Sequence, residues 1–380
     1  MIKQSKLPNV QTTIFTVMSK MAADYGAINL SQGFPNFESD PLLVEAVAKA
    51  MRDGYNQYAP MQGDLGLRER ISEKTEKLYG KKYDPNTEIT ITAGATQAIF
   101  TAIAATIHRG DEVIVFAPAY DCYEPAIELF GGITKPIQLR PPFFRPSWEE
   151  VEQAITSKTK MILVNSPHNP SGMLFTKEDM LQLERLAEKY NLLVISDEVY
   201  EHILFDGEAH QSAARFETLS KRTFITASFG KTFHNTGWKM GYCLAPEALM
   251  KEFQKVHQYN VFCVNHPMQK GLSTYLDTPQ HYLSLPQFYQ EKRDYFLHLI
   301  KDSRFRWVPS KGTYFQLLDY SNITSERDKA FAERLTKEHK LATIPTSVFN
   351  KNQEDFKQLR VCFAKTKATL EEAAAILNKI

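Results

Sequence analysis

Residues 191–200 read NLLVISDEVY, an apolar and partly β-branched run that ends in an acidic pair and a tyrosine. A short run of this kind is typical of a buried strand. Four similar runs lie along the same part of the chain, at 88–92 (EITIT), 112–116 (EVIVF), 160–164 (KMILV) and 223–226 (TFIT). Longer amphipathic segments separate them, so we predict an α/β fold with a mainly parallel sheet and helical crossovers.

The composition indicates a folded protein that does not recognise its partners by bulk charge. Of the 380 residues 43% are hydrophobic, and 45 Lys and Arg against 44 Asp and Glu leave a net charge of +1. The four cysteines lie too far apart for a metal-binding or redox pair. No apolar run approaches the roughly 20 residues of a membrane span. We therefore expect a cytoplasmic protein without a metal site, a nucleic-acid partner or a membrane anchor.

The composition of the segments changes after Gly271, and this change predicts a second architectural unit. Long charged and aromatic segments such as 287–301 follow, then a strand-like run at 312–318 and a helix that leads to Ile380. No internal repeat or low-complexity tract is present.

The residues that follow each predicted strand are the first candidates for chemistry, because ligands of open parallel sheets bind beyond the carboxyl ends of the strands. The run at 88–92 is followed by AGATQ at 93–97. These small residues form either an ordinary turn or a set of backbone amides that hold an anion at a helix N-terminus. The run at 160–164 is followed by NSPHNPSG at 165–172, a cluster of turn-forming residues that holds two asparagines in place.

Three charged residues stand out in apolar surroundings. Asp197, at the end of a strand, is either a helix cap or a functional acid. Lys231 lies in SFGKTF at 228–233, where burial would lower the pKa of its amine and free it for chemistry. Arg360, in LRVCF at 359–363, is either an edge-strand charge or a bidentate receptor for a carboxylate.

Four motifs in this order resemble the signature of the class I aminotransferases of pyridoxal phosphate fold type I: NSPHNPSG (165–172), SDEVY (196–200), SFGKT (228–232) and GWKMG (237–241). Within that family, SQGFP at 31–35, YNQY at 55–58 and LRVCF are similar to the methionine and kynurenine (glutamine) aminotransferase branch. The resemblance spans about residues 29–364. It implies a mainly parallel seven-stranded sheet flanked by helices, in a large domain at 41–284. A smaller α+β domain would combine residues 1–40 and 285–380.

The resemblance also implies a role for each candidate residue. Lys231 would hold pyridoxal 5'-phosphate covalently and act as the base, Asp197 would pair with the ring nitrogen, and Tyr200 would bond the phenolic oxygen. The other cofactor-binding residues would be Asn169 at the phenolic oxygen, Tyr120 on the ring face, Gly94, Ala95, Thr96, Ser228 and Lys239 at the phosphate, and Tyr58 from a second subunit. The substrate would contact Arg360, Gly33, Asn169, Phe15 and Phe34.

The implied activity is transfer of an α-amino group by a homodimer. Methionine, glutamine or aromatic amino acids, with kynurenine among them, would give the amino group to a 2-oxo acid by a ping-pong mechanism. In the resembling branch the side-chain pocket is lined by the stretch around Phe15, the turn at 33–35 and the region at 262–266. This aromatic and apolar surface disfavours dicarboxylic donors, because His266 is its single weakly basic group.

Two alternatives stay open. A pyridoxal phosphate β-lyase that acts on cysteine S-conjugates or cystathionine can use the same Lys, Asp and Arg. A non-catalytic regulator with this fold would need an added basic DNA-binding segment.

Overall fold

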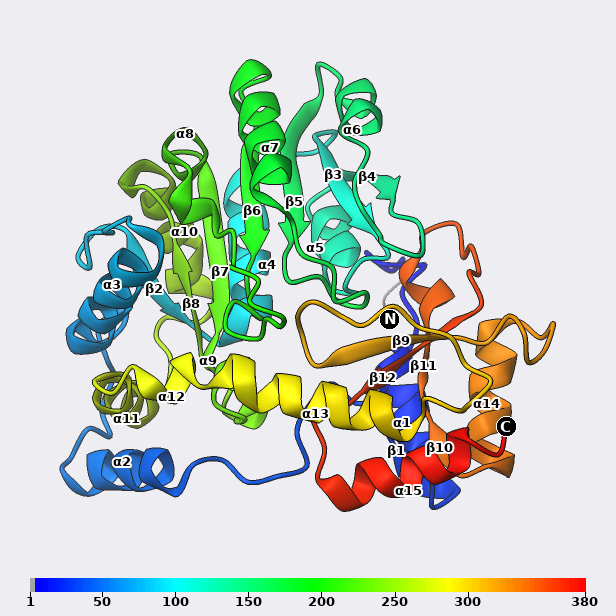
Figure 1. Cartoon of the computed structure of the whole chain (residues 1–380). Helices are drawn as coiled ribbons and strands as arrows, with labels where there is room; N and C mark the ends of the chain where they lie inside the picture. Colours follow the sequence, from blue (N-terminus) through cyan, green and yellow to red (C-terminus); the bar gives the residue numbers. More distant parts are fainter. Residues whose placement is uncertain (1–3) are drawn as a thin grey trace.

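A seven-stranded sheet with the order β2-β8-β7-β6-β5-β3-β4 forms the centre of the larger part of the molecule (Figure 1). The structure is a computed structural model that describes residues 4–380, so residues 1–3 of the predicted small domain lie outside the described residues. Neighbouring strands are parallel except where β8 pairs with β2 and β7. The predicted fold, a mainly parallel seven-stranded α/β sheet, is confirmed. The strands are β2 (Ile89–Thr92), β3 (Glu112–Ala117), β4 (Ile133–Gln138), β5 (Thr159–Asn165), β6 (Leu193–Asp197), β7 (Thr223–Ser228) and β8 (Gly241–Leu244).

Helices cover both faces of this sheet. In β5, Met161 and Leu163 pack into the apolar layer under one set of helices, whereas Ile162 and Val164 pack into the layer under the other. This alternation follows from the two-residue period of a strand. Because both faces are buried, the strands read as nearly continuous apolar runs. One face carries α4 (Gly94–Thr106), α5 (Tyr123–Leu129) and α10 (Glu247–Asn260), and the other carries α6 (Trp148–Ala154), α7 (Lys177–Lys189) and α8 (Glu217–Ser220) (Figure 1).

Helix α7 shows how the local sequence sets a helix boundary. The Thr176 side chain accepts from the Asp179 amide and the Asp179 side chain accepts from the Thr176 amide, which is a capping box. Met180, Leu183 and Leu186 then follow at helical spacing and are buried against the sheet.

A smaller group of strands combines the two ends of the chain. β1 (Ile28–Asn29) pairs in parallel with β10 (Leu341–Ala342). β12 (Gln358–Cys362) lies between β11 (Ile344–Pro345) and β9 (Phe315–Asp319) in an antiparallel sheet. Helices α1 (Ile14–Asp24), α14 (Asp328–Glu338) and α15 (Lys367–Leu377) lie in this part, and α13 (Leu285–Leu299) runs toward it from the large sheet (Figure 1). The division into domains at 1–40 with 285–380 and at 41–284 stays a prediction.

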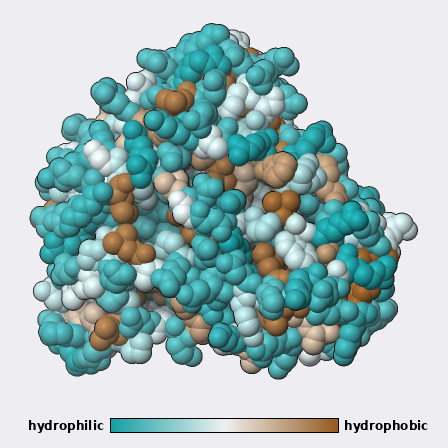
Figure 2. Space-filling model, in the orientation of Figure 1, coloured by the Kyte–Doolittle hydropathy of each residue, from teal (hydrophilic) through white to brown (hydrophobic). Residues whose placement is uncertain are grey.

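The surface in view is mostly hydrophilic, with hydrophobic residues in small separate groups (Figure 2). Within residues 4–380, none of the helices is long and apolar enough to cross a membrane. The cytoplasmic location stays a prediction. The remaining elements are α2 (Pro41–Arg52), α3 (Leu65–Tyr79), α9 (Phe229–Thr232), α11 (His266–Leu276), α12 (Gln280–Leu283), η1 (Ala213–Arg215), η2 (Thr236–Trp238) and η3 (Thr346–Phe349).

A buried charged cluster anchors the turn that follows β6. The Lys74 amine of α3 lies 2.6 Å from Glu201 Oε1, 2.7 Å from the Tyr242 hydroxyl and 3.1 Å from His202 Nε2. Tyr79 donates to the other Glu201 oxygen at 2.6 Å. Burial alone would raise the pKa of Glu201, but Lys74 and His202 bring it well below its ordinary value. The cluster therefore fixes the turn between Asp197 and Glu201 to α3.

We predict that Lys74→Ala lowers the free energy of unfolding by about 3–5 kcal/mol at pH 7, because it leaves the Glu201 carboxylate buried and unpaired. Denaturant titration would measure the loss. Lys20→Ala is the matched control, since Lys20 forms an exposed ion pair with Asp24 one helical turn away. That pair should contribute less than about 1 kcal/mol. Equal losses in the two variants would contradict the prediction.

Candidate active site

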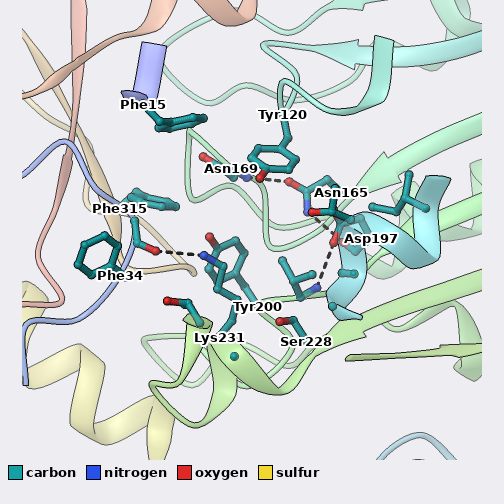
Figure 3. A pocket seen from close by; sticks show the side chains of 18 of the residues that line it. Phe15, Phe34, Tyr120, Asn165, Asn169, Asp197, Tyr200, Ser228, Lys231 and Phe315 are labelled. Carbon is teal, nitrogen blue, oxygen red and sulfur yellow. Dashed lines mark hydrogen bonds between the residues drawn. The ribbon is translucent and has the colours of Figure 1, made fainter. Parts of the chain in front are cut away.

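Three parallel strands end side by side and each ends in a polar residue. β5 ends at Asn165, β6 at Asp197 and β7 at Ser228. Asn165 lies opposite Asp197 in the register of β5 and β6, and Asp197 lies opposite Thr226 in β7. The Asn165 side chain makes two hydrogen bonds: its Nδ2 donates to the Asp197 backbone carbonyl at 3.0 Å, and its Oδ1 accepts from the Asn169 backbone amide at 2.8 Å (Figure 3). These contacts fix the 165–172 turn to the end of β6.

A cavity of about 290 Å³ lies beyond these strand ends. It brings together the residues that the resemblance pointed to, except Tyr58 and the predicted pocket segment at 262–266. Residues from the chain ends close the cavity opposite the sheet, with Phe15 and Phe34 on that side (Figure 3). The predicted residues that line it are Phe15, Gly33, Phe34, Gly94, Ala95, Thr96, Tyr120, Asn169, Asp197, Tyr200, Ser228, Lys231, Lys239 and Arg360.

Asp197 is a buried carboxylate in this cavity. Burial raises its pKa to about 6, against a lowering effect of hydrogen bonds from the Tyr123 hydroxyl and the Val199 amide. The hydroxyl lies 2.5 Å from Oδ2 and the amide 3.2 Å from Oδ1. Tyr200, three residues further along, is also buried and lines the same cavity.

Lys231 follows β7 in the short helix α9, and its amine lies inside the cavity. The amine donates to the Gly33 carbonyl at 3.0 Å, and the Tyr314 hydroxyl donates to the same oxygen at 2.6 Å. Burial lowers the pKa of Lys231 to about 8. A substantial fraction of this amine is therefore neutral, and able to accept a proton, near physiological pH.

Arg360 lies in the centre of β12 and is almost fully buried, at 1% exposure. Its guanidinium donates to the Asn169 side-chain oxygen and to the Ser31 carbonyl, both at 2.9 Å. Its Nε has no partner among the described residues. Phe315 packs under the guanidinium, with 3.9 Å between the Arg360 Cζ and the ring centroid. The central position of β12 between β11 and β9 excludes an edge-strand charge, and the guanidinium lines the cavity as a fixed positive charge.

The N-terminus of α4 forms a second place for negative charge. Gly94 has φ +78°, which favours glycine, and no side chain caps the helix. A Cβ at Gly94 would lie 3.4 Å from the Lys239 amine. The free amides of the first turn, the Lys239 cation and the Ser228 hydroxyl thus converge on one side of the cavity, which suits an anion.

Tyr58 is the predicted phosphate-binding residue that lies outside the cavity. It is 81% exposed and packs edge-on against Phe262, with ring centroids 5.2 Å apart. It does not line the cavity of its own chain. His266 is also outside this cavity and lies 3.0 Å from the Gln57 carbonyl through Nδ1.

Sequence reasoning missed several residues that shape the site. Tyr123 bonds Asp197, Tyr314 bonds the Gly33 carbonyl, and Phe315 supports Arg360. A Cβ at Gly33 would lie 2.7 Å from the Phe315 ring, so the close approach of that ring requires glycine there. No pattern in the sequence singles out Tyr123, because its partner Asp197 lies 74 residues further along the chain.

Comparison with known proteins gives consistent results over the whole chain. The family described as aminotransferase class I and II matches residues 25–377. The chain is 47% identical to the methionine aminotransferase of Escherichia coli (strain K12), over 100% of this chain and 99% of that protein. It is 34% identical to human kynurenine–oxoglutarate transaminase 3, over 98% and 89%. A solved Escherichia coli structure, described as identifying a methionine aminotransferase function, has a TM-score of 0.98 at 47% identity and covers 100% of both chains.

We predict that Lys231 reacts with an amine-directed reagent at lower pH than exposed lysines do. Because burial depresses its pKa, the neutral and reactive fraction should rise through about pH 8, whereas ordinary lysines titrate near ~10.4. Competitive acetylation of the cofactor-free chain, followed peptide by peptide in a mass spectrometer, measures the reactivity of Lys231 and of the exposed lysines in one sample. A Lys231 peptide that follows the same pH curve as the peptide of exposed Lys20 would contradict the prediction.

Proposed function

We propose that this chain, which belongs to the class I and II aminotransferase family and is an aminotransferase, uses pyridoxal 5'-phosphate and prefers methionine, glutamine or aromatic donors, kynurenine included. The amino group would pass to a 2-oxo acid in two successive half-reactions of a ping-pong mechanism. The observation that carries the proposal is that one cavity is lined by the buried amine of Lys231, the buried carboxylate of Asp197 and the buried guanidinium of Arg360.

The residues of the cavity fit this cofactor in charge and in shape. The first turn of α4 with Gly94, Ala95 and Thr96, together with Ser228 and Lys239, would hold the phosphate. Asp197 would pair with the ring nitrogen, and Tyr200 and Asn169 would bond the phenolic oxygen. Tyr120 would cover the ring face. When bound, the cofactor supplies an electron sink for the bond that breaks at the substrate α-carbon.

Lys231 would carry the proton in the reaction. Burial lowers the pKa of its amine, so the neutral form would take the proton from the substrate α-carbon at neutral pH and deliver it to the C4′ carbon of the cofactor. The Gly33 carbonyl, 3.0 Å away, accepts one of its hydrogens and so restricts the direction of the lone pair. Asp197 supports this step by keeping negative charge beside the ring nitrogen.

Arg360 would bind the substrate α-carboxylate, assisted by Asn169 and Gly33. Its guanidinium plane is fixed by hydrogen bonds to Asn169 and Ser31, and a fixed planar guanidinium suits a bidentate contact with a carboxylate. Phe15, Phe34 and Phe315 supply the apolar wall for the side chain of the donor. Lys231, Lys239 and Arg360 are the cationic residues among the described residues that line the cavity, and each already has a proposed partner. A second carboxylate would be buried without a counter-charge, at a cost of several kcal/mol.

We predict that kcat/KM for methionine and phenylalanine exceeds that for aspartate by at least about tenfold. A panel of amino donors against several 2-oxo acids, assayed with the cofactor-loaded enzyme, measures the preference. Lys231→Ala is the control and should abolish turnover. Activity with aspartate equal to that with methionine would overturn the substrate assignment. Pyruvate and ammonia released from cystathionine would indicate the β-lyase alternative, which the relatives do not favour.

We also propose that two copies of the chain form the active enzyme and that Tyr58 reaches the phosphate of the partner. Tyr58 does not line the cavity of its own chain and is exposed, and its ring packs edge-on against Phe262, which is 43% exposed. Aromatic surface of this kind is typical of a protein interface.

We predict that light scattering of the loaded enzyme gives twice the chain mass of 43.5 kDa. Tyr58→Ala should weaken cofactor binding without changing the fold, because it removes a hydrogen-bond donor to the phosphate. Leu181→Ala, at an exposed apolar residue on α7, is the control and should change neither mass nor cofactor binding. A fully active monomer at the assay concentration would refute the proposal.

A further inference from the structure

Tyr123 is a buried tyrosine whose hydroxyl contacts the Asp197 carboxylate of the site. It is the first residue of α5, it is 2% exposed, and its ring packs in the apolar layer under α4 and α5. Its hydroxyl donates to Asp197 Oδ2 at 2.5 Å. The Val199 amide donates to Oδ1 at 3.2 Å. Each oxygen of the carboxylate therefore has one fixed donor.

These two donors act from different elements. Val199 belongs to the same turn as Asp197, so its contact is local. Tyr123 comes from α5, 74 residues earlier in the chain, and its position is set by packing against the sheet. Tyr120, which lies before the same helix, lines the cavity, and the two rings meet edge-on with centroids 5.9 Å apart. The start of α5 thus positions both the Tyr120 ring, which lines the cavity, and the Tyr123 hydroxyl, which donates to Asp197.

We propose that Tyr123 is a positioning residue that keeps the Asp197 carboxylate ionised and in one orientation toward the cavity. The inference rests on the proposed function, in which Asp197 pairs with the ring nitrogen of pyridoxal phosphate. A carboxylate that turned away or became protonated would lose that pairing. The Tyr123 hydroxyl counteracts both changes, because a phenol that donates to the charged form stabilises it.

The electrostatic surroundings of Asp197 explain why a donor is needed. Burial raises the pKa of Asp197, and the neighbouring Glu198 raises it further, while the Lys231 amine lowers it. Tyr120 and Cys122, on the side of α5, also face it. Burial and the charge of Asp197 raise the pKa of the Tyr123 phenol well above its ordinary value, so the phenol keeps its proton and remains a donor.

Tyr123→Phe tests the inference, because it removes the hydroxyl and keeps the ring that packs against the sheet. The matched control is Tyr83→Phe, since Tyr83 is equally buried and its hydroxyl has no partner among the described residues. Equilibrium dialysis of the enzyme against pyridoxal 5'-phosphate, from pH 6 to 9, should show binding about 10- to 100-fold weaker in Tyr123→Phe and unchanged in Tyr83→Phe.

An infrared titration of the full-length chain without cofactor gives a readout that does not depend on the proposed function. The carboxylic acid band lost in Asp197→Asn identifies Asp197, and its midpoint should rise by about one pH unit in Tyr123→Phe. If Tyr123→Phe does not fold, 3-fluorotyrosine at position 123 provides the second variant. Its more acidic phenol donates more strongly, so the midpoint should fall.

The two readouts separate the possible failures. If the wild-type chain binds no pyridoxal phosphate, the proposed function fails, and the infrared midpoint still decides the role of Tyr123. A midpoint and a dissociation constant in Tyr123→Phe that match those of Tyr83→Phe would overturn the inference. A midpoint unmoved by 3-fluorotyrosine would overturn it as well.

Discussion

The parallel hydrogen-bonded register of β5, β6 and β7 is the constraint on which the site depends. Parallel strands place their carboxyl ends at the same edge, so the residues that end them, Asn165, Asp197 and Ser228, are neighbours although they are far apart in sequence. The Asn165 amide then links two adjacent strand ends directly. A shift of one residue in this register would turn the alternate side chains to the opposite face and disperse the polar groups into the two apolar layers.

Burial of charge gives these groups their chemistry. Removal from water disfavours the ionised form of any group, so the same cavity lowers the pKa of the Lys231 amine and raises that of the Asp197 carboxyl. The lowered pKa suits Lys231 to act as a base near neutral pH, whereas the raised pKa of Asp197 opposes the ionised form that the site needs. Hydrogen bonds then decide which form each group keeps: two donors favour the Asp197 carboxylate, and the Gly33 carbonyl accepts from the Lys231 amine.

Local patterns predicted the sheet, and the resemblance of the motifs to a known family predicted most of the residues of the cavity. Apolar runs define the strands, and the polar residues that follow them share an edge, so position and residue type made Asp197 and Lys231 candidates, and the resemblance then implied their roles. Tyr123 and Phe315 could not, because their contacts with Asp197 and Arg360 depend on how a helix packs on the sheet and how β9 pairs with β12. Lys74 reads as an ordinary helix lysine, and only the tertiary structure buries it beside Glu201.

Arg360 shows how the smaller group of strands completes the site. The guanidinium stays charged although it is buried, because its pKa starts far above neutrality. Aromatic rings replace part of the lost hydration, with Phe315 at 3.9 Å and Phe15 at 5.1 Å from Cζ. Gly33 admits the Phe315 ring, and the Ser31 and Asn169 oxygens fix the plane. The same rings that contact the cation also form the apolar wall of the cavity, so one set of residues supports both parts of the proposed preference, a substrate with a single carboxylate and a side chain without a charge.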